Sequence, residues 1–218
     1  MSNILDSLKE YLSPELISEA AKFYSEHEVG VSKAIGSLAS AMLAGILQKS
    51  GDSHSIDTIF SSIRDFDPAI LGNLGSLLGG GNLAHNDPKD VSGHLVGIIF
   101  GAKVPAIASS VASFSGVKQS TASALIGLAG PLIMGLLSLK ISAEGLKPTG
   151  LVSYLLSQKS NFLSVLPSGT ASLLGFVNSG MSDRSGNEKS IGGLGWFWPL
   201  MVLLALGGAT VFYLKNCS

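Results

Sequence analysis

The feature that most constrains this chain is an apolar run close to its C-terminus. From Ile191 to Leu214 the sequence contains no charged residue. A helix needs about 20 apolar residues to cross the hydrocarbon core of a bilayer. Helices in the cores of soluble proteins are usually shorter, about 10–14 residues, and keep a polar stripe. The run therefore predicts a transmembrane helix over residues 195–214, and a buried core helix is the alternative interpretation.

Six residues of this run are typical of a membrane anchor: Trp196, Trp198, Pro199, Gly207, Gly208 and Tyr213. The aromatic residues stand near the two ends, where amphipathic rings favour the headgroup zone. The proline falls in the first turn, where its missing N–H costs least. The glycine pair is common in spans and permits a second helix to approach closely, so a homo-oligomer is an open possibility. These features make the lipid bilayer the first predicted partner.

Charges on either side of the run indicate its orientation. Arg184 and Lys189 precede it, and Lys215 alone follows it. The excess of basic residues before the span favours a cytosolic N-terminal part. The N-terminus shows no basic stretch followed by an apolar one, so no secretory signal peptide is recognisable there. We expect a single-pass, tail-anchored membrane protein with a cytoplasmic N-terminal domain.

The composition of the chain argues against some functions and bonds for the remaining residues. The net charge is −1, and charged residues make up 13% of the chain, about half the usual share. The basic residues are dispersed, and no basic surface with interleaved aromatic residues is recognisable, so nucleic acid is not an expected partner. Cys217 is the only cysteine, which rules out an intrachain disulfide.

The sequence offers no convincing set of catalytic or ligand-binding residues. His85 and His94, with Asp87 and Asp90, contain metal-ligating groups, but they lack the tight helical spacing of zinc sites. The glycines at 79–81 follow no strand and precede no Gly-Lys-Ser/Thr, so they read as a linker rather than a phosphate loop. We therefore expect no enzyme activity, no cofactor, no metal and no small-molecule substrate.

Local signals predict an all-α fold. Alternating strand patterns are scarce, whereas Ser13-Pro14-Glu15 reads as an N-cap, a proline at the first helical position and an acidic first turn. Asp67-Pro68 and Asp87-Pro88 predict two further helix starts of the same kind. The predicted helices cover residues 3–12, 14–26, 31–49, 55–65, 68–78, 88–100, 104–114, 118–140, 149–158 and 170–178.

The chain also resembles itself at a spacing of roughly 90 residues. The segment 30–47 can be laid on 116–137 after a four-residue gap, and 17–26 on 107–116. This pattern predicts a duplicated multi-helix bundle, with chance similarity between Ala/Leu/Gly-rich helices as the alternative. The predicted organisation is a helical domain over 1–179, with halves 1–80 and 83–179, a flexible linker over 180–194, and the transmembrane helix.

Two apolar segments within the halves need a separate interpretation. Residues 119–139 carry no charge, yet their first third is polar and Pro131 interrupts the middle. Their counterpart, 34–48, looks too short to cross a bilayer and is bounded by lysines. We therefore expect both to be central helices of the domain, wrapped by the other helices.

These same segments resemble a known family. Residues 116–125, followed by Gly130-Pro131 and Leu136-Leu137, are similar to the core motif of the YidB-like bacterial proteins, the family called domain of unknown function 937. The N-terminal segment 3–23, followed by 30–35, is similar to a first copy of that motif. The resemblance covers roughly residues 2–178. It implies an all-α fold and a bacterial source, and it supplies no catalytic residues.

In some members of that family a similar domain precedes a membrane span and a peptidoglycan-binding OmpA-like domain. This sequence ends four residues after the predicted span, so the resemblance implies no wall-binding function. The first expectation is a helical protein-interaction or scaffold module at a membrane, with an unknown protein partner. The alternative is a membrane-remodelling or pore-forming protein whose central helices insert. A third possibility is an enzyme whose site is assembled from scattered polar residues.

Overall fold

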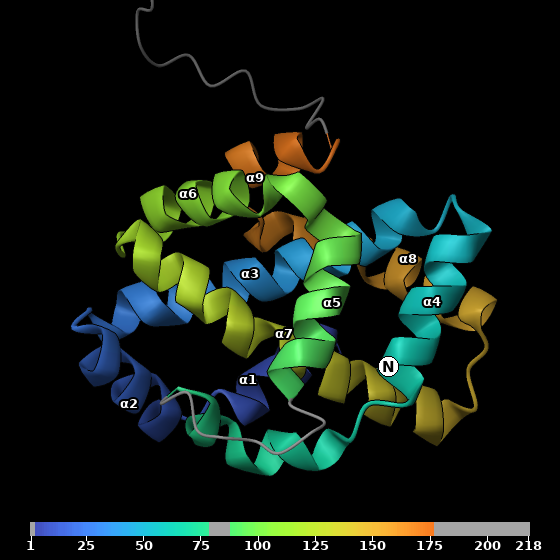
Figure 1. Ribbon diagram of the computed structural model, residues 1–218, viewed down its shortest axis with the longest axis horizontal. Helices are drawn as coiled ribbons and strands as arrows, with labels where there is room; N and C mark the ends of the chain where they lie inside the picture. Colours follow the sequence, from blue (N-terminus) through green and yellow to red (C-terminus); the bar gives the residue numbers. More distant parts are fainter. Residues whose placement is uncertain (1–2, 79–87, 177–218) are drawn as a thin grey trace, which may run out of the picture. The chain divides into compact units, whose positions relative to one another are not determined.

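The computed structural model describes residues 3–78 and 88–176, which belong to one compact unit, Met1–Ser179. These described ranges contain helices and no strand, which confirms the all-α fold class. The transmembrane helix expected over 195–214, the linker expected over 180–194 and residues 79–87 lie outside the described residues. Figure 1 shows the helices of the unit gathered around two central ones, α3 and α7.

Within each described range, the helices follow one another with short connections. Their bounds are α1 Ile4–Tyr11, α2 Pro14–Tyr24, α3 Glu28–Lys49, α4 Ser53–Arg64, the 3-10 helix η1 Pro68–Leu77, α5 Pro88–Phe100, the 3-10 turn η2 Gly101–Lys103, α6 Val104–Ser115, α7 Gln119–Glu144, α8 Pro148–Val165 and α9 Ser168–Leu173.

Side-chain caps fix several helix starts. The hydroxyl of Ser13 accepts a hydrogen bond from the Leu16 N–H at 3.2 Å. The Asp67 carboxylate accepts one from the Ala69 N–H at 2.9 Å. Such caps satisfy N–H groups that have no partner inside the helix. The helix starts predicted at these two Pro-containing signals are therefore confirmed.

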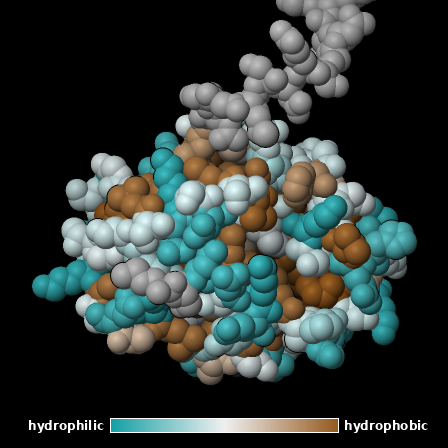
Figure 2. Space-filling view, turned by 180° about the vertical axis from the view of Figure 1, so that it is seen from behind, coloured by the Kyte–Doolittle hydropathy of each residue, from teal (hydrophilic) through white to brown (hydrophobic). Residues whose placement is uncertain are grey.

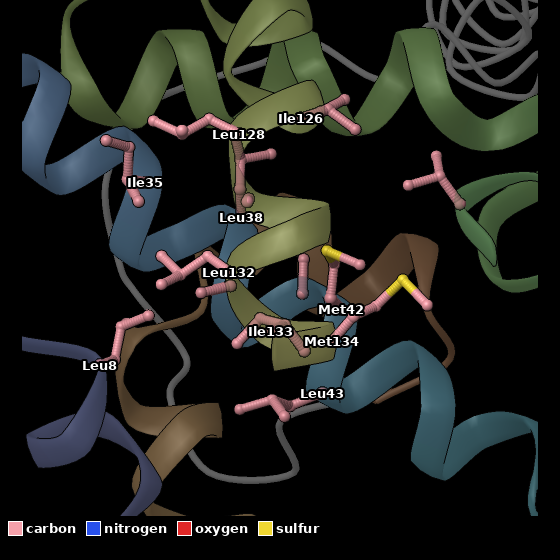
Figure 3. Packing of buried hydrophobic residues seen from close by; sticks show 14 of the residues in the cluster. Leu8, Ile35, Leu38, Met42, Leu43, Ile126, Leu128, Leu132, Ile133 and Met134 are labelled. Atoms are coloured by element: carbon pink, nitrogen blue, oxygen red, sulfur yellow. The ribbon is translucent and has the colours of Figure 1, made fainter. Parts of the chain in front are cut away.

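The two longest helices, α3 and α7, form the centre of the core. They contact each other, and α5, α6 and α8 contact α3 while α1, α4, α5, α6 and η1 contact α7. Figure 3 shows the side chains where α3 and α7 meet, among them Leu38 and Met42 beside Leu132 and Met134. Those four side chains are at most 1% exposed. The predicted arrangement, two central helices wrapped by the others, is confirmed within the described residues.

Small residues on the central helices let their neighbours approach closely. A Cβ atom added at Gly45 of α3 would overlap the Cγ2 methyl of Ile99 and lie 3.0 Å from Phe100 Cε1. One added at Gly135 of α7 would lie 2.8 Å from Leu71 Cγ. Close packing of this kind increases the dispersion contacts of the core. It also makes these positions intolerant of larger side chains.

Several boundaries differ from the sequence prediction. Residues 68–77 form a 3-10 helix broken at Asn73, whose φ of −142° and ψ of 44° are not helical. The glycines on either side, Gly72 and Gly75, weaken a regular α-helix there. The helix expected over 149–158 continues to Val165, because Phe162 is buried against the core one turn beyond the expected end.

Three segments are long and apolar enough to cross a membrane by length and composition: Glu28–Lys49, Ser92–Ser115 and Gln119–Glu144. The expectation that the first central helix is too short to cross is therefore wrong. Within the unit, however, 78% of the most apolar window of the first and of the third segment is buried, compared with 44% for Ser92–Ser115.

Burial repeats along the chain in a constant register. Every buried position of α3 has a buried counterpart 91 residues later in α7, as in Ala34 and Leu125. The buried residues of α1 recur at the same spacing in α5, and those of α2 recur in α6. In this register Phe23 corresponds to Phe114, whereas the sequence comparison pairs Phe114 with Tyr24. The two pairings differ by one residue, which corresponds to a rotation of about 100° around a helix. The sequence comparison therefore pairs side chains on different helix faces.

The matching of Gly30 with Gly116 is also wrong in structural terms. Gly116 ends α6 in the left-handed region, with φ 78°. Gly30 lies inside α3 and is buried. The residue that ends α2 in the same left-handed conformation is Ser25, with φ 53°. The four-residue gap raises the spacing of the sequence comparison from 86 to 90 residues, one residue short of the register of buried positions.

Two glycines of α3 provide a matched test of the packing. Gly45→Ala should lower the free energy of unfolding by about 1 kcal/mol or more, because the added methyl overfills a closed contact. Gly36→Ala should raise it by roughly 0.5–1 kcal/mol, since a Cβ added there would meet no other atom within 4 Å. Chemical denaturation followed by circular dichroism measures both. Equal shifts in one direction would contradict the close contact.

Candidate functional site

The six predicted anchor residues lie outside the described residues, so the structure places none of them: Trp196, Trp198, Pro199, Gly207, Gly208 and Tyr213. A candidate site in the described part of the chain must come from its surface and its buried polar groups. Figure 2 shows, on one face, hydrophobic patches scattered between hydrophilic ones. Places that combine polar groups with a hollow or a tertiary contact include a junction of two helix corners, a crevice beside α1 and a groove beside α6.

Metal-binding groups do not converge within the described part of the chain. No group of three or more His, Cys, Asp or Glu side chains there is arranged to hold a metal ion. His94 is exposed on α5. His85 and Asp87, which the sequence placed beside it, lie outside the described residues, and the side chain of Asp90 is not described either.

The first place is the contact between two helix corners. Glu26 lies between α2 and α3, and its side chain is only 8% exposed. Its Oε1 accepts hydrogen bonds from the Lys118 backbone N–H at 2.9 Å and from Thr121 Oγ1 at 2.8 Å. The Lys118 ammonium lies 3.9 Å from the same oxygen. The carboxylate therefore caps the N-terminus of α7, where Lys118 provides no side-chain acceptor of its own.

This environment lowers the pKa of Glu26 below its ordinary value of 4.5. The hydrogen bond from the Lys118 N–H has the largest effect, followed by the one from the Thr121 hydroxyl. Both bonds favour the charged carboxylate, as does the positive end of the helix macrodipole. The arrangement stabilises a junction between two helix pairs and presents no group suited to catalysis.

The second place is a shallow crevice between α1, α7 and α8. Ile4, Tyr11 and Leu136 contribute to its lining. The Lys140 ammonium lies 4.7 Å from the centre of the Tyr154 ring and forms an ion pair with Glu144. Burial raises the pKa of the Tyr154 hydroxyl; Lys140 opposes the shift and Glu144 adds to it. This cation is held between a carboxylate and an aromatic face.

The third place is a groove where α6 meets the connection from α8 to α9. Phe114, 51% exposed, and Val165, 37% exposed, contribute apolar side chains to it. Serines contribute most of the rest, and Thr170 Oγ1 donates a hydrogen bond to Ser110 Oγ at 2.9 Å. No lining residue of this groove is charged. Its chemistry fits a weakly polar surface better than an ionic ligand.

Sequence reasoning missed both the Glu26 cap and the exposed pair Phe23 and Phe114. As a sequence position, the glutamate reads as part of a solvated helix face, because nothing local shows that a corner 92 residues away provides its partner. The pair has a local signal: each phenylalanine lies two residues before a left-handed helix end. Using that signal requires the 91-residue register between corresponding buried positions.

The Glu26 cap predicts a specific pH dependence. Because folding lowers the pKa of Glu26, its contribution to stability is present above pH 4.5 and is lost as the pH falls through the lower folded value. Glu26→Gln should therefore reduce the melting temperature at pH 7, and the gap to the wild type should close towards pH 3. Circular dichroism melts measure this gap. The exposed Glu10→Gln variant should have the melting temperature of the wild type at each pH. A difference in melting temperature between Glu26→Gln and the wild type that stays constant with pH would contradict the cap.

A family model described as a bacterial protein of unknown function, DUF937, matches residues 6–140. The match runs from α1 to Lys140 of α7 and leaves out α8 and α9. No curated protein and no solved structure matches the chain. Because the match covers more than half of the sequence, it confirms the expected resemblance over a shorter range than 2–178. The chain belongs to this bacterial family of unknown function, the family of the YidB-like proteins.

Proposed function

We propose that this protein is a helical interaction or scaffold module held at a bacterial inner membrane by a transmembrane helix over residues 195–214. The uncharged run from Ile191 to Leu214, with aromatic residues towards both ends, is the observation that carries the proposal. Confining a domain to a membrane surface raises its effective concentration for a partner at the same surface. A weak contact is then sufficient for function.

The packing of the body supports an anchor separate from the body. The apolar faces of α3 and α7 are buried against other helices of the same unit, so these helices need no lipid to cover them. The basic residues Arg184 and Lys189 before the run, against Lys215 after it, favour a body on the cytoplasmic side. The protein partner is not specified by any of these features.

The alternative is a membrane-remodelling or pore-forming protein. One observation favours it: three segments of the body are long and apolar enough to span a bilayer. Ser92–Ser115 is the least covered of them, with 44% of its most apolar window buried. In this alternative, the central helices would leave the core and exchange helix contacts for lipid contacts.

Deletion of residues 191–218 distinguishes the two proposals. The truncated chain should leave the membrane fraction and remain helical, because the linker separates the anchor from the body. The full chain should stay with membranes after a carbonate wash. Sedimentation of the truncated chain with carbonate-washed membranes would contradict the single anchor and favour insertion of the body. Cys217, the only cysteine, reports orientation in the same cells through a membrane-impermeant maleimide.

We also propose that the body is a duplicated bundle whose halves interlock. Two contacts related by the 91-residue spacing support this proposal. Gly30 lies against Val117, where an added Cβ would be 3.0 Å from Val117 Cγ1. Their counterparts in the same register, Thr121 and Glu26, are joined by a hydrogen bond. Reciprocal pairing of this kind is typical of an interface with two-fold symmetry.

The helices around the centre support the interlocking. α8 of the second half contacts α1, α3 and α4, all of the first half. α4 of the first half contacts α7 and α5 as well as its own neighbour α3. Each central helix therefore buries part of its surface against the other half.

Splitting the body tests the proposed halves. Residues 1–78 and 88–179, produced separately, should each lack a cooperative thermal transition, because each would expose the surface that the other covers. Mixed together, they should form a one-to-one complex with the helix content of the intact body. Size-exclusion chromatography and circular dichroism measure both properties. A cooperative melt from either half alone would contradict the interlocked arrangement.

A further inference from the structure

The surface formed by α6, the end of α8 and α9, here called the α6–α9 face, differs from the rest of the unit. Phe114 and Val165 are exposed beside the uncharged groove. At another part of the face, Lys103 Nζ donates a hydrogen bond to the Leu173 carbonyl at 2.8 Å. Lys159 Nζ lies 5.5 Å from the centre of the Phe176 ring. Apolar side chains and lysines thus share one surface, on which α6 and α9 lie side by side (Figure 1).

Charge separates the two halves of the body. Residues 88–176 have two acidic residues, Asp90 and Glu144, and six lysines. Residues 3–78 have ten acidic residues against five basic ones. The segments 101–118 and 156–176, which make the α6–α9 face, contain no acidic residue. Segments that contain lysines and no carboxylate suit a negatively charged partner, except at Lys118, which pairs with Glu26.

The first half contains a matched counterpart of this face. Phe23 corresponds to Phe114 in the 91-residue register and is 57% exposed. It lies in a segment, 15–28, that has four glutamates and one lysine. The two phenylalanines thus combine similar exposure with sequence neighbours of different charge, although Lys118, four residues after Phe114, pairs with Glu26. An anionic surface should therefore favour position 114 over position 23.

The chain leaves the described unit at this same face. Phe176, the last described residue, lies under the Lys159 ammonium and follows α9. The proposed span begins at residue 195. A polar random coil as long as residues 177–194 would have an r.m.s. reach of roughly 20–25 Å. Under the proposed anchor, the exit of the chain at this face would therefore limit the distance between this face and the bilayer.

We propose that the α6–α9 face lies against the anionic surface of the bilayer that holds the anchor, with Phe114 and Val165 at the headgroup boundary and Lys103 and Lys159 over acidic lipid. This inference rests on the proposed anchor. It assigns the body a fixed orientation, in which the acidic first half faces away from the membrane and is presented to the cytoplasm.

The test uses the full chain with Cys217→Ser, reconstituted in vesicles that contain nitroxide-labelled lipid. An environment-sensitive fluorophore is attached at Phe114→Cys or, as the matched control, at Phe23→Cys. In vesicles rich in phosphatidylglycerol, lipid quenching at position 114 should exceed quenching at 23 at least twofold. In phosphatidylcholine vesicles, or at high salt, the ratio should fall towards one. Lys159→Glu should lower quenching at 114, and Lys22→Glu should not.

The outcomes separate this inference from the anchor. Carbonate-resistant protein with equal quenching at both positions, or with none, overturns the orientation and leaves the anchor in place. A position-114 probe that lipid does not quench, but that is shielded from aqueous iodide in native membranes, assigns the face to a protein partner and also overturns it. Protein that carbonate extracts overturns both proposals. Circular dichroism of each labelled variant confirms that the fold is retained.

Discussion

The fold depends on the contact between α3 and α7, two long helices with almost no charged residues in their middle parts. Leu38, Met42, Leu132 and Met134 are at most 1% exposed where these helices meet. Helices that are apolar on most sides need neighbours on most sides, and the surrounding helices provide them. Glycine at 45 and 135 brings Ile99 and Leu71 close enough to complete that cover. The remaining helices occupy positions that this pair determines.

Local signals made the central part of the fold predictable. The N-caps at Ser13 and Asp67 depend on residues two or three positions apart, so the sequence contains the whole interaction. The central helices were recognisable from long apolar segments flanked by polar residues. Predictions failed where the deciding contact is tertiary. Burial of Phe162 extends α8 past its expected end, and Asn73 interrupts η1, where two glycines leave little intrinsic helix preference.

The distinction between local and tertiary contacts also explains which features of the candidate site could be predicted from the sequence. The proposed anchor is a property of consecutive residues, so the sequence alone supports it. The Glu26 cap joins residues 92 positions apart, and the α6–α9 face combines segments about 50 residues apart, so neither has a local pattern. The missing step was the 91-residue register between corresponding buried positions. Left-handed helix ends at Ser25 and Gly116 fix that register, but only glycine is a recognisable signal of this conformation in a sequence; serine is not.

The body and the proposed anchor are both rich in apolar residues. There is a physical reason why only the anchor is proposed to enter the membrane. In α3 and α7, polar residues and lysines lie at the ends, and most of the apolar middle is covered by protein. Leaving the core would expose buried serines such as Ser37 and Ser138 to lipid, along with the uncovered faces of every helix packed on them. Insertion therefore requires loss of the whole core. An uncharged run of consecutive residues such as Ile191 to Leu214 would enter a bilayer without that cost, which favours a separate anchor over a body that unfolds into the membrane.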